Sequence, residues 1–156
     1  MLNIVKEEKA GRFMPWKKEY VLGIPLVDKQ HKVLVGLTDD LYEACREGVV
    51  SAEATFREAS HIVVDYVKIH FSTEEKIMDK TGYPDAPAHK GEHRAFVAKF
   101  LKELADFEDG KAFVYYDFAH FLKDWILNHV SVNDKKMVDY VLHSVGNRVS
   151  GENRAG

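Results

Sequence analysis

The stretch His70-Phe-Ser-Thr-Glu74, continued after Gly82-Tyr83-Pro84 by His89-Lys-Gly-Glu-His93, decides the fold of this chain. In each outer string the first and last residues are spaced i,i+4, so on a helix both project from one face. Gly82 and Pro84 disfavour a helix interior, so the two strings belong to two helices joined by a tight turn. A short turn makes these helices antiparallel neighbours, which lets the four side chains converge. The spacing therefore predicts that three imidazoles and a carboxylate bind metal inside a helical bundle.

A structural role for these residues is the alternative to metal binding. A histidine on a helix is usually solvated or a hydrogen-bonded core residue, and an i,i+4 pair of histidine and glutamate is often a surface pair. Here both pairs lie within apolar stripes, where an ionisable group is costly unless it is paired or bound to metal. The stripe positions on the two helices are Val63, Val67, His70, Glu74, Ile77 and Met78, and His89, His93, Phe96, Phe100, Leu104 and Phe107.

The composition indicates one globular domain. The chain has 156 residues, of which 46% are hydrophobic and 30% charged, and this is enough for a real core. A net charge of −3 offers no basic patch for nucleic acid. No stretch is long and apolar enough to span a membrane, and no apolar signal segment is visible at the N-terminus. The single cysteine, Cys45, excludes an internal disulfide and fits a reducing compartment. We therefore expect a cytoplasmic protein and a monomer.

The rest of the chain fits an all-α fold, an antiparallel up-down four-helix bundle. Phe13, Trp16 and Tyr20 form an N-terminal aromatic arm that is expected to pack against the bundle. Prolines and glycines mark the ends of helices expected at approximately these residues: 25–48, 51–81, 88–110, and from 112 onward. The expected organisation of the chain is a flexible N-terminal extension over residues 1–12, the bundle over 13–145, and a polar, frayed tail over 146–156.

The last helix is expected to break near its metal-binding residues. Asp134 lies five residues after His129, roughly 140° away on a regular helix, so the two side chains share a face only if the helix is interrupted. Ser131-Val-Asn-Asp134 resembles a capping box, with the serine starting a new turn and the acid in its first turn. We therefore predict a break there, followed by a short C-terminal helix over about residues 133–142.

Spacing also separates the histidines into two sets. His31 lies in the inward stripe of the first helix. His61 and His120 each precede a candidate ligand by nine residues, and nine helical residues turn through about 900°, which places both on the outward face. His143 lies near the frayed end. Five histidines are therefore expected to converge, and three are not.

The candidate metal ligands come from all four helices and are His31, His70, Glu74, His89, His93, His129 and Asp134. With their neighbours they resemble the haemerythrin family, most closely its single-domain bacterial form. The matching strings are Trp16-x3-Tyr20-x2-Gly23-Ile24-x3-Asp28-x-Gln30-His31, His70-Phe71-x2-Glu74-Glu75-x2-Met78, Tyr83-Pro84-x4-His89-x2-Glu92-His93 and Trp125-x3-His129-x4-Asp134. The resemblance covers about residues 16–140. It departs mildly at Val130 and Met137, where the family often has isoleucine and tyrosine.

The resemblance implies a non-haem centre of two iron ions, joined by an oxygen atom, that binds dioxygen. Counted with that oxygen, one iron has six ligands and the other five, which leaves one position open for dioxygen. The residues implied by position are His89, His93 and His129 for the first iron, His31 and His70 for the second, and Glu74 and Asp134 as carboxylates that bridge both.

This donor set favours reversible binding of dioxygen over catalysis. Carboxylate-rich di-iron sites in ferritin-like bundles use more glutamates, and anionic ligands stabilise ferric iron. Five neutral imidazoles and two carboxylates instead allow dioxygen to bind without a net change in buried charge. Phe71, Ile126 and Val130 are expected to wall the open position with apolar groups that exclude water and protons. The leading expectation is therefore oxygen carriage, storage or delivery, with no catalytic residue.

Two other classes of function stay open. One is a sensory module that reports oxygen or redox state to an unidentified protein partner, although no signalling sequence is fused to this chain. The other is an enzyme with oxidase, peroxidase or nitric-oxide-reducing chemistry, although no general acid or base is evident beside the open position. The lifetime of the oxygenated site would separate these classes, because a long-lived adduct supports carriage.

Overall fold

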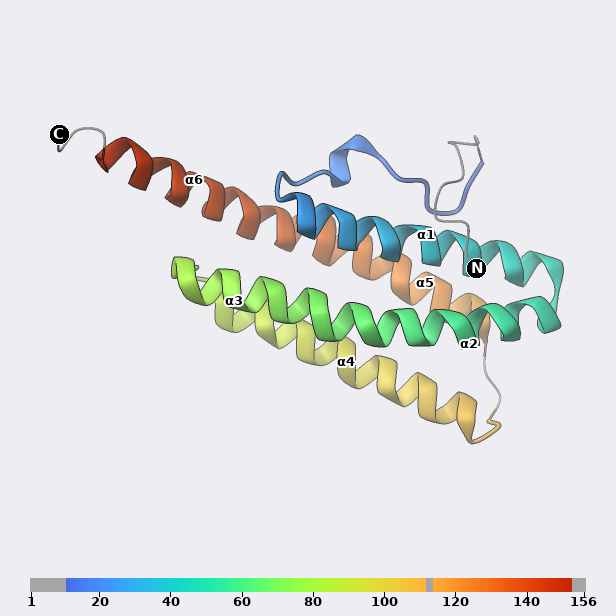
Figure 1. Cartoon of the computed structure of the whole chain (residues 1–156). Helices are drawn as coiled ribbons and strands as arrows, with labels where there is room; N and C mark the ends of the chain where they lie inside the picture. Colours follow the sequence, from blue (N-terminus) through green and yellow to red (C-terminus); the bar gives the residue numbers. More distant parts are fainter. Residues whose placement is uncertain (1–10, 112–113, 153–156) are drawn as a thin grey trace.

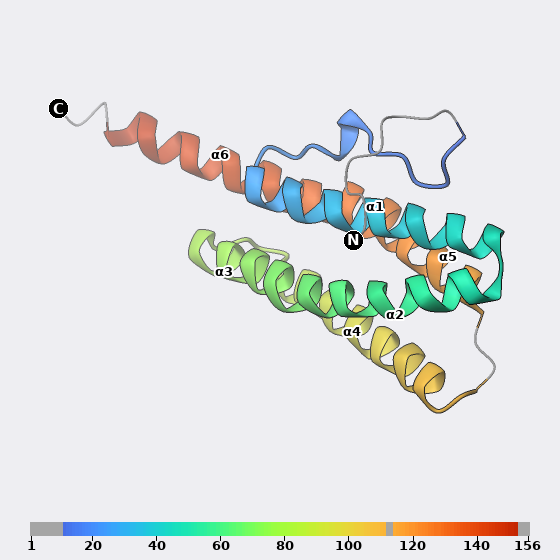
Figure 2. The ribbon, with the colours of Figure 1, turned by 45° about the vertical axis from the view of Figure 1, so that its right-hand side comes forward.

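The helices of the chain pack side by side as four rods (Figures 1 and 2). The structure, a computed structural model, describes residues 11–111 and 114–152. Two segments, η2 and η3, are π-helical and join their neighbours without a break, so α2–η2–α3 is one rod and α5–η3–α6 another. The described residues therefore form the predicted all-α four-helix bundle. In chain order the elements are η1 (Lys18–Tyr20), α1 (Pro25–Glu47), α2 (Val49–Tyr66), η2 (Val67–Phe71), α3 (Ser72–Thr81), α4 (Ala86–Glu108), α5 (Tyr115–Trp125), η3 (Ile126–Asp134) and α6 (Lys135–Glu152).

Glycines end two of the rods where the sequence predicted. Gly48 (φ 129°) separates α1 from α2, and Gly82 (φ 68°) ends α3, in conformations that would strain any other residue. After Gly82, the backbone N–H of Tyr83 donates to the carbonyl of Met78 at 3.1 Å, which is the closing bond of a Schellman motif. The predicted tight turn between the two histidine-bearing helices is therefore confirmed.

Two apolar clusters fill the bundle, one on each side of a layer of buried polar residues. The larger cluster contains Phe56 and Phe118, and the smaller one contains Met78 and Met137. On the rods α2–η2–α3 and α5–η3–α6, members of the larger cluster precede the predicted metal ligands and members of the smaller cluster follow them. Burial of a large apolar side chain stabilises the fold by about 1.5–3 kcal/mol. The clusters therefore offset the cost of burying the polar layer.

The predicted aromatic arm packs against the bundle. The ring of Phe13 stacks on Tyr42 with 3.8 Å between centroids, and Tyr20 is buried. Arg12, at the end of the predicted extension, forms an ion pair with the buried Asp39 at 3.4 Å. Residues 1–10 of that extension lie outside the described residues.

Two predictions about the C-terminal rod are wrong. Ser131 does not cap a new helix, because its hydroxyl donates back to the carbonyl of Ile126 at 3.0 Å within a continuous π-helical segment. The final helix is also not short, because α6 continues to Glu152, into the stretch predicted as a frayed tail. The turns of a π-helix are wider than those of an α-helix, so the five-residue spacing of His129 and Asp134 fits one face of the segment and no break is needed.

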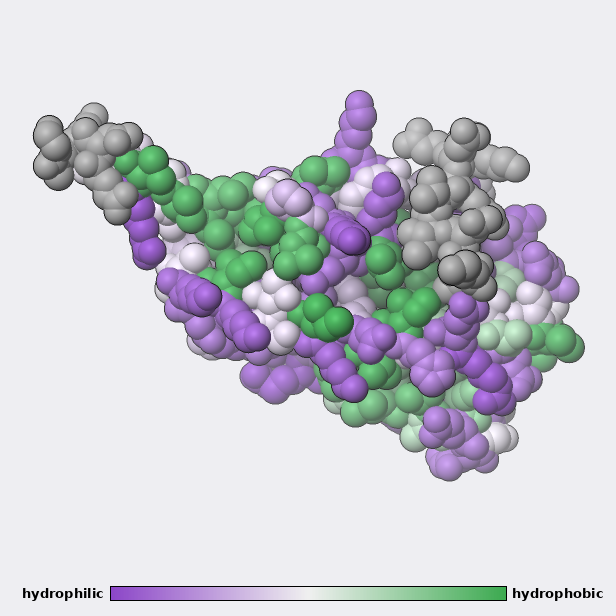
Figure 3. Space-filling model, in the orientation of Figure 1, coloured by the Kyte–Doolittle hydropathy of each residue, from purple (hydrophilic) through white to green (hydrophobic). Residues whose placement is uncertain are grey.

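The outer part of α6 projects beyond the other rods (Figure 1). It exposes Leu142, Val145 and Val149 to 45%, 51% and 55%, and the space-filling view shows hydrophobic residues along this part of the surface (Figure 3). Among the helices of the described ranges, none has the length and apolar character needed to cross a membrane.

Candidate metal centre

All seven predicted ligands are buried, and each rod contributes at least one. His31, His70, Glu74 and Asp134 are 0% exposed, His93 and His129 are 2% exposed, and His89 is 4% exposed. Their elements are α1 for His31, η2 and α3 for His70 and Glu74, α4 for His89 and His93, and η3 for His129 and Asp134. The tertiary structure therefore brings together side chains that are up to about a hundred residues apart in the chain.

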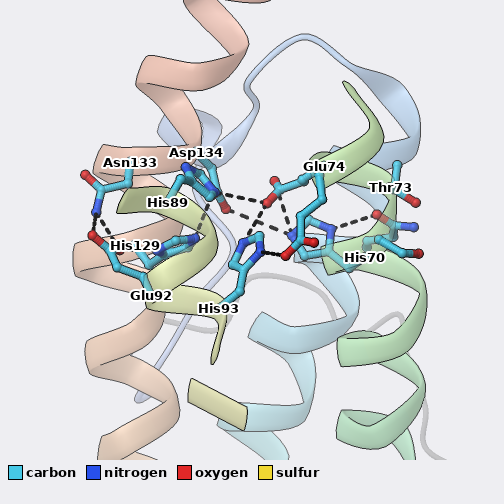
Figure 4. A network of polar contacts seen from close by, with 12 residues as sticks. His70, Thr73, Glu74, His89, Glu92, His93, His129, Asn133 and Asp134 are labelled. Carbon is cyan, nitrogen blue, oxygen red and sulfur yellow. Dashed lines mark hydrogen bonds and ion pairs between the residues drawn. The ribbon is translucent and has the colours of Figure 1, made fainter. Parts of the chain in front are cut away.

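The seven side chains form two adjoining groups that share both carboxylates. One group is Glu74, His89, His93, His129 and Asp134, and the other is His31, His70, Glu74 and Asp134. In each group the candidate ligand atoms lie within 4.8 Å of one another. Figure 4 shows His93 and His129 pointing toward the carboxylates of Glu74 and Asp134.

Each carboxylate directs one oxygen at each group. Asp134 places Oδ1 at 3.0 Å from His129 Nε2 and 3.1 Å from His89 Nε2, while its Oδ2 lies 3.0 Å from His31 Nε2. Glu74 does the same, with Oε2 at 3.2 Å from His93 Nε2 and Oε1 at 3.3 Å from His70 Nε2. A carboxylate that bridges two metal ions needs one oxygen directed at each ion, and Glu74 and Asp134 both meet this requirement.

The π-helical segment η3 explains how His129 and Asp134 reach the same group. In a π-helix the backbone bonds run from i to i+5, so residues five apart lie nearly one above the other. The sequence correctly predicted that Asp134 turns toward His129, but the cause is widened turns rather than a capped restart. The second π-helical segment, η2, carries His70 and Phe71.

Three ligands are held by a second hydrogen bond on the ring nitrogen that faces away from the centre. His70 Nδ1 lies 2.7 Å from Gln30 Oε1, and His93 Nδ1 lies 3.0 Å from Glu75 Oε1. His129 Nδ1 contacts Glu92, whose carboxylate also accepts from Asn133 at 2.8 Å (Figure 4). Such partners fix the ring orientation and leave Nε2 free to bind metal. The sequence-based predictions gave these four residues no role, although Gln30, Glu75 and Glu92 lie in the strings that resemble the family and Asn133 precedes a ligand.

The polar atoms at the centre fit metal ions. Among the described residues, several buried side-chain atoms of the centre have no hydrogen-bond partner. They are His93 Nε2, His129 Nε2, Glu74 Oε1 and both side-chain oxygens of Asp134. A buried polar atom without a partner costs about 1–3 kcal/mol, and all these atoms face the same interior. Imidazole and carboxylate donors suit transition metals such as iron better than magnesium or calcium. The residues therefore suit a pair of transition-metal ions.

The charges of the buried side chains at the centre also favour cations. Burial would raise the pKa of Asp134, but contacts with His129, His31 and His89 hold it well below its usual value. Burial lowers the pKa of His70 to about 4. Burial would also lower the pKa of His89, but Asp134 and Glu74 raise it to about 9. The two buried carboxylates therefore need positive charge beside them.

Aromatic rings cover three of the histidines. Phe71 stacks on His93 with 3.9 Å between centroids, Trp125 stacks on His129 at 3.8 Å, and Tyr66 stacks on His70 at 4.6 Å. The predicted pocket residues Phe71, Ile126 and Val130 are all buried, the last two completely. The sequence-based predictions gave Tyr66 no role, although it precedes His70 by four residues.

The histidines predicted to face outward do so. His61, His120 and His143 are all exposed, and none belongs to either group of candidate ligands. The separation of the histidines by helical spacing is therefore confirmed.

A helical bundle whose four rods each contribute buried donors to two adjoining groups belongs to the metal-binding class of four-helix bundles.

The sequence matches the model of the "Hemerythrin HHE cation binding domain" over residues 22–141. A bacteriohemerythrin of Pseudomonas aeruginosa is 30% identical over 141 residues, which cover 90% of this chain and 90% of that protein. A bacteriohemerythrin of Methylococcus capsulatus is 33% identical over 123 residues, which cover 78% of this chain and 92% of that protein. A crystal structure of wild-type hemerythrin has 30% sequence identity and a TM-score of 0.73, and the match covers 83% of this chain and 98% of that chain. The chain belongs to the haemerythrin family.

Proposed function

We propose that this protein binds dioxygen reversibly at a centre of two iron ions, for oxygen carriage, storage or delivery. The observation that carries the proposal is that Glu74 and Asp134 each offer one oxygen to each group of histidines. The proposed ligands are His89, His93 and His129 for one iron, His31 and His70 for the other, and the two carboxylates as bridges.

The two groups differ by one histidine, and this difference supports a ligand-binding role. The group around His31 and His70 offers one protein donor fewer than the group around His89, His93 and His129. An open metal position is the usual mark of a site that binds an external ligand, whereas a purely structural site is closed. Iron ions bound here would supply the two electrons that dioxygen takes up on binding and returns on release.

The surrounding residues keep water away from that position. Ile126 and Val130 are 0% exposed, and Ile126 lies three residues before His129 on η3. Phe71 covers the face of His93 and, with Val97 and Leu101, lines an open groove of about 510 Å³ between α4 and the η2–α3 part of the neighbouring rod. Exclusion of water and protons protects the oxygenated site from irreversible oxidation.

Metal analysis and repeated oxygenation test this proposal. We expect two irons per chain, and an optical band of the oxygenated protein that appears in air and disappears under vacuum over several cycles. A His61→Gln variant is the matched control, because His61 is an exposed histidine outside the site. One iron per chain, or a band that decays within a single cycle, would overturn the proposal.

A sensory role is the second candidate, and the position of α6 favours it. The proposed bridging residue Asp134 is followed directly by Lys135, the first residue of α6, and α6 exposes Leu142, Val145 and Val149 beyond the bundle. A shift at the metal centre would therefore reach an apolar helix face. Amide hydrogen exchange tests this candidate, because rates in α6 that are the same with and without oxygen would exclude it.

A further inference from the structure

Among the described residues, two buried hydrogen-bond donors beside the candidate metal centre have no acceptor. Tyr66 is 6% exposed, and neither its hydroxyl nor the indole Nε1 of Trp125 has a hydrogen-bond partner among the described residues. Both atoms are buried, and both rings stack on proposed metal ligands, Tyr66 on His70 and Trp125 on His129. An orphaned donor at such a position indicates that something else accepts its proton.

The rings of the two donors have a common neighbour, Phe71. The ring of Phe71 lies 5.6 Å from that of Tyr66 and 5.7 Å from that of Trp125, so all three rings belong to one aromatic layer. Burial and then the charges of Asp134 and Glu74 raise the pKa of Tyr66 well above its ordinary value, and Trp125 partly opposes this rise. The phenol is therefore close both to the carboxylates of the centre and to the indole.

We propose that the hydroxyl of Tyr66 donates a hydrogen bond to the small ligand bound at the open position on the His31 and His70 side, and that Trp125 holds the phenol in place. This inference rests on the proposed function, because it assigns a residue to the ligand of that same site. The ligand class is a small molecule with lone pairs on the atom that faces the phenol, such as dioxygen or azide.

A purely structural role explains the hydroxyl less well. Phenylalanine would fill the same space, stack on His70 in the same way, and avoid the cost of an unsatisfied buried hydroxyl, about 1–3 kcal/mol. The neighbouring position of the aromatic layer, Phe71, has such an apolar ring. The indole N–H can donate to the phenol oxygen and leave the phenol proton free for the ligand, because a hydroxyl both donates and accepts.

Azide binding to the iron-loaded ferric protein tests the inference. In Tyr66→Phe we expect the Kd for azide, measured by optical titration, to rise about tenfold, which corresponds to about 1.4 kcal/mol. In the parent protein the infrared stretch of bound azide should shift between H2O and D2O, and in Tyr66→Phe this shift should be lost. Trp125→Phe should keep a reduced shift, because the phenol stays but is less well held.

Tyr20→Phe is the matched control, since Tyr20 is a buried tyrosine that packs against Trp16 rather than the metal centre. Metal-free Tyr66→Phe should unfold at a temperature close to that of the parent, because the phenylalanine ring keeps the stacking on His70. Azide affinity in Tyr66→Phe within twofold of the parent would overturn the inference. If that variant fails to load iron, absence of the isotope shift in the parent would overturn it. A parent that binds no iron would instead refute the proposed function.

Discussion

Replacement of Glu92 by alanine should weaken iron binding, although Glu92 is not among the seven proposed ligands. Its carboxylate contacts His129 Nδ1 and accepts two hydrogen bonds from Asn133 Nδ2, at 2.8 and 3.0 Å. Burial would raise the pKa of Glu92, but the hydrogen bonds from His129 and Asn133 lower it, so it is ionised at neutral pH. Without it, His129 loses the contact that fixes its ring and directs Nε2 at the metal.

The expected loss of affinity is about tenfold. Loss of such an outer partner typically costs 10–100-fold in metal affinity, or about 1.4–2.7 kcal/mol. The lower end applies here because the Glu92 side chain is 46% exposed, so water can replace the carboxylate as acceptor for Nδ1. The measurement is equilibrium competition for iron between the protein and a chromophoric chelator.

Two variants complete this experiment. Glu92→Gln keeps a side-chain oxygen that can accept from His129 and should lose less affinity than Glu92→Ala. Glu53→Ala removes an exposed glutamate that pairs with Arg57 on α2, and it should leave affinity unchanged. Equal affinities for Glu92→Ala and Glu53→Ala would refute the reasoning, because the outer hydrogen bond would then have no influence on the metal.

Three further outcomes are expected. Ile126 is one of the residues proposed to wall the open position, so Ile126→Glu should place an ionisable group there and speed decay of the oxygenated form at least tenfold, or about 1.4 kcal/mol of barrier. Ile126→Val should change the decay little. Stopped-flow optical measurement of the decay tests this, and equal rates for both variants would show that the pocket lies elsewhere. His61→Gln should leave the iron content unchanged and the free energy of unfolding within about 0.5 kcal/mol of the parent, whereas His93→Gln should lose iron. Thermal unfolding and metal analysis of the two variants test this. Since Asp134 and Glu74 raise the pKa of His89 to about 9, a metal ion that binds below that pH must displace a proton from His89. The apparent metal affinity should therefore fall by roughly tenfold for each unit by which the pH is lowered below 9. Competition with a chelator from pH 6 to 9 measures this change.

Local rules were enough to predict the faces of the helices. An i,i+4 spacing puts both members of a pair on one face whatever the rest of the chain does, so the pairs His70/Glu74 and His89/His93 could be assigned before the fold was known. Gly82 demands a backbone conformation that other residues avoid, so the turn after α3 was predictable too. The outward position of His61 follows from the same arithmetic.

The π-helical segment η3 could not be predicted by these rules. The spacing of His129 and Asp134 showed that a regular helix would not serve, but a capped break and a widened turn both satisfy that spacing. Ser131 is compatible with either, since its hydroxyl can cap a helix or donate back to the carbonyl of Ile126, as it does. The choice depends on whether packing on both sides keeps the rod continuous, and this is a property of the whole bundle.

The sequence by itself determined the helical class, the ends of most helices, and the set of buried histidines and carboxylates, because each depends on the spacing of residues along one helix. Only the tertiary structure decided which oxygen of Glu74 and Asp134 faces which group, and which side chains support the ligands. His70 contacts Gln30, forty residues away in the chain, and the polar atoms of Tyr66 and Trp125, on different rods, are buried without a hydrogen-bond partner among the described residues. Such contacts depend on the rotation and axial offset of each rod against its neighbours, which are set by packing of the whole core.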